Sequence, residues 1–267
     1  MTRILAILSK ELADLSRNRG LFYPAVMTGI AAMIIPFFVA ILVPYFTGER
    51  LSDSSDFQVA IEMYRTQPAT RGLSPEGAVQ AWIFQQFLLL LVLTPIAGAM
   101  SVAAYTVIGE KQARTLEPLL ATAITTFELL AAKILGSLIP AVALAVAGFL
   151  VYLGLVATFA ESGVFRVLLA PRSLAIVFVL GPLAALAALQ LAVCVSSRVN
   201  DARSAQQIGA LIILPLTALL VAQLMGSVEL TGSVLMLVTT LLVIVNAVLM
   251  RIGITLFDRE SILTRWK

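Results

Sequence analysis

Residues 134–160 read ILGSLIPAVALAVAGFLVYLGLVATFA and contain no Asp, Glu, Lys or Arg. A helix needs roughly 20 apolar residues to cross about 30 Å of hydrocarbon, and a charge near the bilayer centre costs at least about 2.5 kcal/mol. This stretch therefore predicts a membrane-spanning helix. Charge-free windows of the same kind recur at 20–48, 77–109, 173–197, 204–228 and 230–250.

The six windows predict an all-α integral membrane protein, with residues 1–267 forming a single transmembrane domain of six helices. A hydrophobic content of 60% and a mean hydropathy of +1.00 lie far above the range of soluble domains. The first window is too long for the apolar region of a signal peptide and follows Glu11 and Asp14, so we expect it to be a true span. The expected spans cover about 22–46, 82–108, 134–158, 173–195, 205–225 and 233–255, with an external loop at 47–74 and a cytoplasmic loop at 109–133.

Composition also removes several kinds of chemistry. The chain has no histidine, which excludes a His general base, a Ser-His nucleophile, His-ligated metals and axial-His haem binding. Cys194 is the only cysteine, so an internal disulfide is impossible and a packing role is expected. We therefore predict no catalytic, cofactor-binding or metal-binding residues in this chain.

The placement of basic residues predicts the topology. Thirteen of the 18 Lys and Arg residues lie in the two terminal segments and in alternate connections, and five lie on the opposite side. The positive-inside rule therefore places both termini in the cytoplasm. A pI near 9.2 could indicate nucleic-acid binding, but these residues are distributed as topology requires, so no nucleic-acid partner is expected.

Residues 3–19 precede the first span and have the pattern of an amphipathic helix lying on the cytoplasmic membrane surface. Their apolar residues gather on one face, while Lys10 and Asp14 lie on the opposite face. Glu11 falls within the apolar arc, which is unexpected for a helix that rests only on lipid. Either Glu11 snorkels toward water, or this interface helix contacts a partner protein or another helix.

Capping signals mark several helix starts. Ser74-Pro75-Glu76 has a capping serine, a proline at the first helical position and an acid in the first turn. Thr125 to Glu128 has the pattern of a capping box. Ser173, which follows Pro171, can cap the fourth span.

The cytoplasmic loop 109–133 begins GEKQARTLEPLLAT. Thr115 can cap a short helix in which Pro118 is tolerated, because the first backbone N–H groups of a helix have no partner within the helix. Leu116 and Leu119 would then be exposed on a helix too short to be stable alone. We expect this helix to dock on a partner or to fold back onto the membrane surface.

The run GEKQARTLEPLLAT, followed by FELLAAKIL, resembles the loop between the second and third spans of the type-2 ABC transporter permeases. The segments around Lys10-Glu11-Leu12 and Phe257-Asp258-Arg259-Glu260 are similar to the two ends of such permeases. The likeness covers essentially the whole chain, including six spans and a larger first external loop. The resemblance implies a multi-pass protein of the inner or plasma membrane of a prokaryote.

The resemblance also implies a half-transporter that dimerises with an identical or homologous permease subunit and binds two separate ABC ATPase subunits. ATP and Mg would be held by those subunits, because this chain lacks the G-x-x-x-x-G-K-[ST] motif and is not itself an enzyme. Lys10 and Glu11 would belong to a second contact with the ATPase. The resemblance assigns coupling to the ATPase to Glu110, Lys111, Thr115, Leu116, Glu117, Pro118 and Leu119.

Five side-chain amides lie within the apolar windows and away from the window ends. Such amides contribute about 0.6 kcal/mol when paired between helices. They either hold helices together or line a substrate path. These residues are Gln85, Gln86, Gln190, Gln223 and Asn246.

The predicted function is that of a permease in an ATP-driven exporter of a hydrophobic or amphipathic substrate, such as a drug or lipid, or of an ion. A secondary transporter driven by an ion gradient is an alternative, although no predicted span holds an acid. An accessory membrane subunit is a further alternative. An intramembrane enzyme is disfavoured because the spans lack His and Asp.

Overall fold

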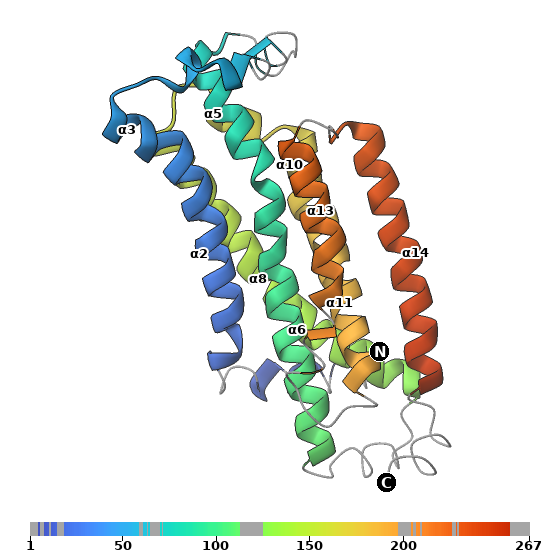
Figure 1. Cartoon of the computed structure of the whole chain (residues 1–267). Coiled ribbons are helices and arrows are strands. Elements are labelled where there is room, and N and C mark those ends of the chain that lie inside the picture. The colour runs from blue at the N-terminus through green and yellow to red at the C-terminus, as the bar shows by residue number, and fades with distance from the viewer. Residues whose placement is uncertain are drawn as a thin grey trace.

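A computed structural model describes residues 5, 8–10, 12–14, 19–58, 61, 62, 64, 70, 72–112, 125–196, 204, 207, 208, 210–225, 228 and 230–256. Within these residues the chain is helical almost throughout and contains no β-strand. The long helices stand side by side in one layered bundle (Figure 1). The prediction of an all-α membrane fold is confirmed at this level, because several of these helices are apolar and long enough to span a bilayer.

The long helical segments, several of which are made of more than one element, follow one another in alternating directions (Figure 1). The first half contains η1 (Arg19–Phe22), α2 (Tyr23–Phe37), η2 (Phe38–Leu42), α3 (Val43–Thr47), η3 (Leu51–Asp53), η4 (Ser55–Phe57), α5 (Pro75–Gln86) and α6 (Leu88–Gln112). The second half contains α8 (Thr126–Phe159), α9 (Val164–Leu168), α10 (Pro171–Ala175), η6 (Ile176–Leu180), α11 (Gly181–Ser196), η7 (Ala210–Ile212), α13 (Ile213–Leu224) and α14 (Gly232–Leu256).

Five helical segments of the described chain have the length and apolar composition needed to cross a membrane. They are Tyr23–Thr47, Pro75–Ala103, Thr126–Phe159, Pro171–Val195 and Gly232–Leu256. The region of the fifth expected span contains a shorter apolar helix, Ala210–Leu224. At 1.5 Å per residue this helix is only about 22 Å long. It runs through the bundle beside the longer helices (Figure 1).

Two of the three capping predictions are confirmed. The Ser74 side chain accepts a 2.9 Å hydrogen bond from the backbone N–H of Gly77 at the start of α5. Thr125 and Glu128 form the reciprocal capping box at the start of α8. The prediction for Ser173 is wrong, because α10 already begins at Pro171 with Ala170 as its N-cap. A proline at the first helical position starts that helix earlier than the serine would.

Two π-helical turns interrupt the transmembrane helices, and each ends two residues before a proline. Phe38–Leu42 precedes Pro44, and Ile176–Leu180 precedes Pro182. A proline ring clashes with the carbonyl four residues earlier and has no N–H to donate, and a widened turn relieves both conflicts. The chain therefore passes these prolines by local widening rather than by breaking the helix.

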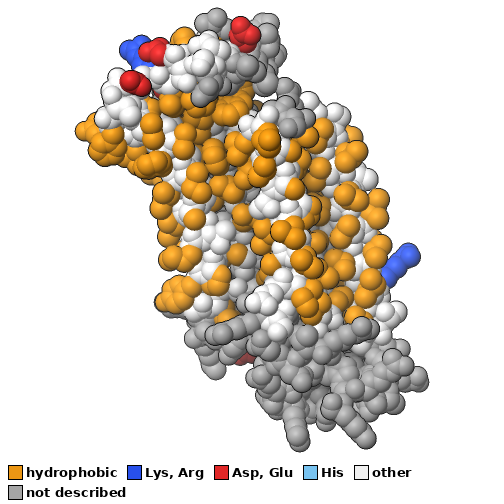
Figure 2. Space-filling view, viewed as in Figure 1, with side chains coloured by type: hydrophobic (Ala, Val, Ile, Leu, Met, Phe, Trp, Pro, Cys, Tyr) orange, Lys and Arg blue, Asp and Glu red, His pale blue; other side chains and the backbone are white. Residues whose placement is uncertain are grey.

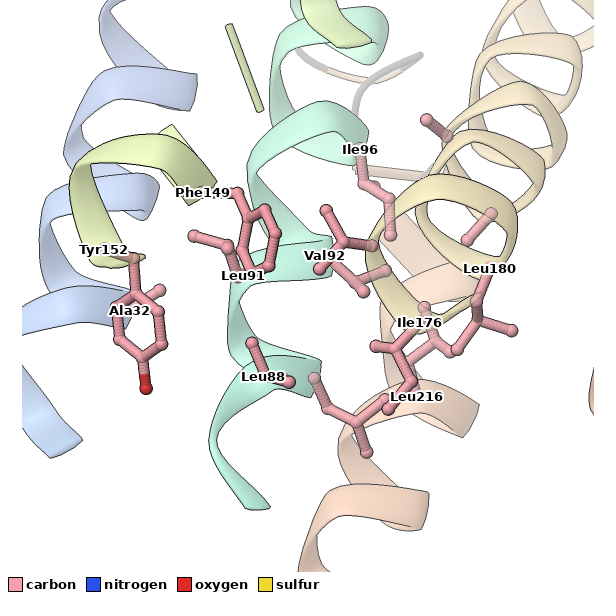
Figure 3. Packing of buried hydrophobic residues seen from close by; sticks show 14 of the residues in the cluster. Ala32, Leu88, Leu91, Val92, Ile96, Phe149, Tyr152, Ile176, Leu180 and Leu216 are labelled. Carbon is pink, nitrogen blue, oxygen red and sulfur yellow. The ribbon is translucent and has the colours of Figure 1, made fainter. Parts of the chain in front are cut away.

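The core lies between α6 and α11, which are the most buried long helices. Leu88, Val92 and Ile96 of α6 point toward Ile176 and Leu180 of the fourth helical segment, as Figure 3 shows. Gly181 also lies close to α6, because a Cβ there would be 3.8 Å from Pro95 Cγ. These two helices therefore form the centre against which the other helices pack.

α8 crosses the bundle diagonally (Figure 1). Near its first turns, the Leu130 side chain is 3.7 Å from the position a Cβ would take at Gly253 of α14. Near its other end, the Tyr152 hydroxyl donates a 3.0 Å hydrogen bond to the Phe84 carbonyl, and its ring meets Phe37 of α2 edge to face. α8 thus connects α14 at one end of the bundle with α2 and α5 toward the other.

The outer surface of the bundle is largely apolar. In Figure 2 hydrophobic side chains cover the middle of the molecule, whereas most charged side chains in view gather at one end. α14 is the most exposed long helix, and its bare apolar side chains include Met236, Leu237, Leu241, Ile244 and Val248. A surface of this kind is suited to lipid or to another apolar protein surface.

Candidate functional site

The predicted coupling segment lies between two helices that end and begin on the same side of the bundle (Figure 1). α6 continues to Gln112, so the backbones of Glu110 and Lys111 are in its last turn. α8 begins at Thr126, which makes both ends of the expected 109–133 loop helical. Thr115, Leu116, Glu117, Pro118 and Leu119 lie outside the described residues.

The start of α8 is rigidly capped directly after this segment. The Thr125 N–H donates a 2.9 Å hydrogen bond to Glu128 Oε2, and the Glu128 N–H donates a 3.2 Å bond back to Thr125 Oγ1. Two otherwise unpaired N–H groups are satisfied in this way. Any force applied to the residues before Thr125 therefore acts on a helix whose first turn is already ordered.

Lys133 is a residue whose surroundings the charge pattern did not predict. We counted it among the basic residues that flank a span, but it lies in the third turn of α8 and is only 3% exposed. It makes a polar or electrostatic interaction. The sequence held no signal for this burial, because a lysine at a membrane boundary usually extends its side chain to water.

The N-terminal interface helix is described only in part. Leu5, the stretch 8–10 and the stretch 12–14 are helical, and Leu5 and Leu12 are exposed. Lys10 Nζ and Asp14 Oδ2 are 4.0 Å apart, and both side chains are more than half exposed. This i, i+4 ion pair therefore contributes little to stability. Glu11 lies outside the described residues, and its two interpretations stay open.

Gln85 is the centre of a polar group that we call the α5 network, formed by Tyr64, Gln85, Val167 and Ser173. The Tyr64 hydroxyl donates a hydrogen bond to Gln85 Oε1, and Gln85 Nε2 donates to Ser173 Oγ at 3.0 Å and to the Val167 carbonyl at 3.4 Å. The Ser173 hydroxyl in turn donates to the same carbonyl at 3.3 Å. These bonds join Tyr64, in the segment before α5, to α5, α9 and α10.

The N-terminal half of α5, away from Gln85, is held by further bonds. Gln80 Oε1 accepts a 2.8 Å hydrogen bond from the Glu161 N–H, and the Ser74 hydroxyl donates to Glu161 Oε2 at 3.2 Å. Glu76 Oε2 accepts from the Ser52 N–H at 2.9 Å. Gln85 therefore acts as an interhelical connector. Gln86, its neighbour, is buried beside it.

The remaining intramembrane amides differ from Gln85, because they contain buried atoms without a hydrogen-bond partner in the described structure. Gln223 on α13 is 2% exposed, and neither its oxygen nor its nitrogen is bonded. Gln190 Oε1 on α11 and Asn246 Oδ1 on α14 are also unpaired, as is the Thr94 hydroxyl on α6. Sequence reasoning treated all five amides alike and could not separate these two groups.

Asn246 makes a partial connection between α14 and α11. Its Nδ2 donates a 3.0 Å hydrogen bond to the Leu183 carbonyl on α11 and a 2.7 Å bond to the Leu242 carbonyl on its own helix. Eleven residues along α11, Cys194 Sγ approaches the Leu249 carbonyl at 3.7 Å. We call the surface between these two contacts the α11–α14 seam, made by Leu183, Gln190, Cys194, Asn246, Leu249 and Gly253.

Among the described residues no three His, Cys, Asp or Glu side chains come together to hold a metal ion. No protein-family model, curated protein or solved structure matches the chain.

Proposed function

We propose that this chain is the membrane-spanning permease subunit of an ATP-driven exporter of the ABC type. The observation that carries the proposal is the EKQARTLEPLL run at 110–120, which starts in the last turn of α6 and continues into the segment that precedes α8. In this proposal Leu116, Glu117 and Leu119 enter a cleft of a separate ATPase subunit. Glu110, Lys111, Thr115 and Pro118 shape and flank the docked helix.

The mechanics of coupling follow from the two flanking helices. α6 packs in the core of the bundle, whereas α8 starts at a capping box and crosses the bundle from α14 to α2. A displacement of the segment between them is passed to both helices, since neither is interrupted near its junction. Closure of the ATPase on nucleotide would thus tilt α8 against the core.

The complete assembly contains two permease subunits, identical or homologous, and two ATPase subunits that hold ATP and Mg. Both termini face the cytoplasm, and the short helix Ala210–Leu224 completes a sixth crossing in the inner or plasma membrane of a prokaryote. A hydrophobic or amphipathic substrate suits this subunit, because the charge-free windows leave no fixed charge along a transport path. The interface helix with Lys10 and Glu11 forms the second ATPase contact.

The double variant Leu116→Ala, Glu117→Ala tests the coupling assignment. Removing a buried leucine anchor and a charged contact from an interface weakens binding by about tenfold or more. We expect normal membrane insertion, but loss of the co-purifying ATPase subunit or of permease-dependent ATP hydrolysis. Both are measured on the complex reconstituted in liposomes.

The matched control is the double variant Phe46→Ala, Glu49→Ala. It removes an exposed apolar side chain and an exposed acid at the end of the bundle opposite the predicted coupling segment. This control should retain ATPase assembly and hydrolysis. If the Leu116 and Glu117 double variant assembles, hydrolyses ATP and transports like the unmodified protein, the coupling assignment is wrong.

A further inference from the structure

The α11–α14 seam contains two buried oxygen acceptors on facing helices. At 100° per residue, Leu183, Gln190 and Cys194 fall within an arc of about 40° on α11. Because Leu183 and Cys194 both contact α14, Gln190 between them faces α14 as well. Gln190 Oε1 and Asn246 Oδ1 are thus presented to the same seam, and each lacks a hydrogen bond.

Such unpaired acceptors are costly within a membrane. A polar group without a partner in an apolar medium is unfavourable, since no bulk water reaches it. The α5 network shows that this chain can satisfy an intramembrane glutamine fully when the amide serves to join helices. By comparison, Gln190 Oε1 and Asn246 Oδ1 lack a hydrogen-bond donor, and both can accept one from a molecule outside the chain.

The position of α14 favours access from the lipid. Little of this helix is buried, and its main contact in the described structure is with α11. A Cβ added at Gly253 would lie at ordinary contact distances of 3.7 Å from Cys194 Sγ and from Leu130 Cδ1, so α14 is not tightly interlocked with its neighbours at this glycine. Leu130 belongs to α8, which directly follows the predicted coupling segment.

We propose that the α11–α14 seam opens to the bilayer and binds an uncharged amphiphile through hydroxyl or N–H groups that donate to Gln190 Oε1 and Asn246 Oδ1. Acceptor oxygens without a nearby acid select donors, and the charge-free windows around both residues exclude a substrate with a buried charge. Arg251 is exposed and lies about 140° around α14 from Asn246, away from the seam. As a transport route, the seam rests on the proposed exporter function; as a binding site, it does not.

A photoreactive long-chain alcohol tests the binding site directly. The full-length chain in liposomes is irradiated with a benzophenone-bearing hexadecanol or with its methyl ether, which has the same chain but cannot donate. We expect the alcohol to label α11 and α14 peptides about fivefold more than the ether, the effect of roughly one hydrogen bond. Equal labelling by the two probes would overturn the proposal.

The double variant Gln190→Met, Asn246→Leu should reduce labelling by the alcohol to the level of the ether, because a single hydroxyl can donate to either of the two oxygens. Gln190→Met alone should reduce labelling in part without lowering the unfolding midpoint measured by circular dichroism. Asn246→Leu alone should also reduce labelling in part, with a slightly lower midpoint because the amide of Asn246 bonds the Leu183 carbonyl. The control Thr240→Val alters an exposed threonine on α14 whose hydroxyl already bonds the Met236 carbonyl, and it should leave labelling unchanged. If Gln190→Met and Asn246→Leu keep full labelling, or lose it only together with their fold, the seam is not the site.

The native cysteine allows the seam to be locked. In Gly253→Cys, the new Cβ would be 3.7 Å from Cys194 Sγ, close enough for a disulfide after a small adjustment. Oxidation should abolish the preference for the alcohol over the ether, and a reductant should restore it. Persistent preference in the oxidised protein would contradict the proposed opening.

The same locked variant separates the two proposals when the ATPase subunits are present. If the seam is the export route, oxidation should also abolish ATP-driven release of the alcohol probe from the membrane, and a reductant should restore it. Alcohol labelling that depends on the seam but never responds to an ATPase subunit would support the binding site and overturn the exporter function.

Discussion

The α5 network and the α11–α14 seam contain the same kind of residue and differ in how completely it is bonded. Gln85 uses its oxygen and its nitrogen to join Tyr64, in the segment before α5, to α5, α9 and α10. Gln190 and Asn246 each keep an unpaired oxygen between α11 and α14. A glutamine in a membrane helix can therefore be a fixed joint, whose amide bonds hold helices together, or an open acceptor, whose oxygen has no hydrogen-bond partner. Only the residues around the glutamine distinguish the two cases.

The packing around the two regions differs in the same direction. Gly98 on α6 lies in a contact with α2 and α8 so close that an added Cβ would be 3.1 Å from Ala25 Cβ and 3.3 Å from Ala141 Cβ. At the seam, a Cβ added at Gly253 would be 3.7 Å from the nearest side-chain atoms, Cys194 Sγ and Leu130 Cδ1. α2, α6 and α8 thus pack closely around Gly98, whereas α14 packs less closely against the bundle at Gly253.

The largest effect is expected where the α5 network is broken. Gln85→Leu leaves the buried Tyr64 hydroxyl and Ser173 without this partner, which should lower the free energy of unfolding by about 2–3 kcal/mol. The unfolding midpoint in detergent can be followed with a thiol-reactive dye, because Cys194 is the only cysteine and is buried. An unchanged midpoint would remove the distinction between a fixed joint and an open acceptor.

A smaller difference is expected between two glycine substitutions. Gly98→Ala places a methyl group against two backbone-anchored Cβ atoms, and we expect a loss of about 1–2 kcal/mol. Gly253→Ala meets only ordinary contacts and gains helix propensity, so its unfolding midpoint should stay equal or rise slightly. Circular dichroism of both variants in the same detergent measures the contrast. Equal destabilisation would show that the seam is as tightly packed as the α2–α6–α8 contact.

The smallest effect on stability is expected for Gln190→Met. The substitution keeps the side-chain length and removes an acceptor that has no partner, so the change should lie within about 0.5 kcal/mol and can be stabilising. The fluorescence of Trp82, which lies in α5, provides a readout of unfolding away from the seam. A loss as large as that of Gln85→Leu would mean that Gln190 is a structural joint after all.

The helix starts and the apolar helices themselves could be predicted from the sequence, because local rules govern them. Ser74 and the Thr125–Glu128 box depend on neighbours within one helical turn. The burial of Lys133 and the role of Ser173 in the α5 network depend on which helices meet, and no local pattern contains that information. Ser173 has the same sequence signature whether it caps a helix or bonds Gln85.

The predicted site shows the same division. Charge-free windows located Gln85, Gln190 and Asn246 inside the membrane helices, but their different hydrogen bonding arises from tertiary contacts. Most of the coupling residues lie outside the described part of the chain. Their assignment therefore still depends on the EKQARTLEPLL run and on its position between α6 and α8.

The length of α8 has a consequence for the host bilayer. Its 34 residues give a rod of about 51 Å, whereas the hydrocarbon layer is about 30 Å thick. Hydrophobic mismatch of this size requires the rod to lean or to project beyond the acyl chains. Lipids with longer tails would let it stand more upright, which changes its angle against α2 and α14. The acyl-chain length of the lipid should thus change the tilt of α8 within the bundle, independently of any nucleotide.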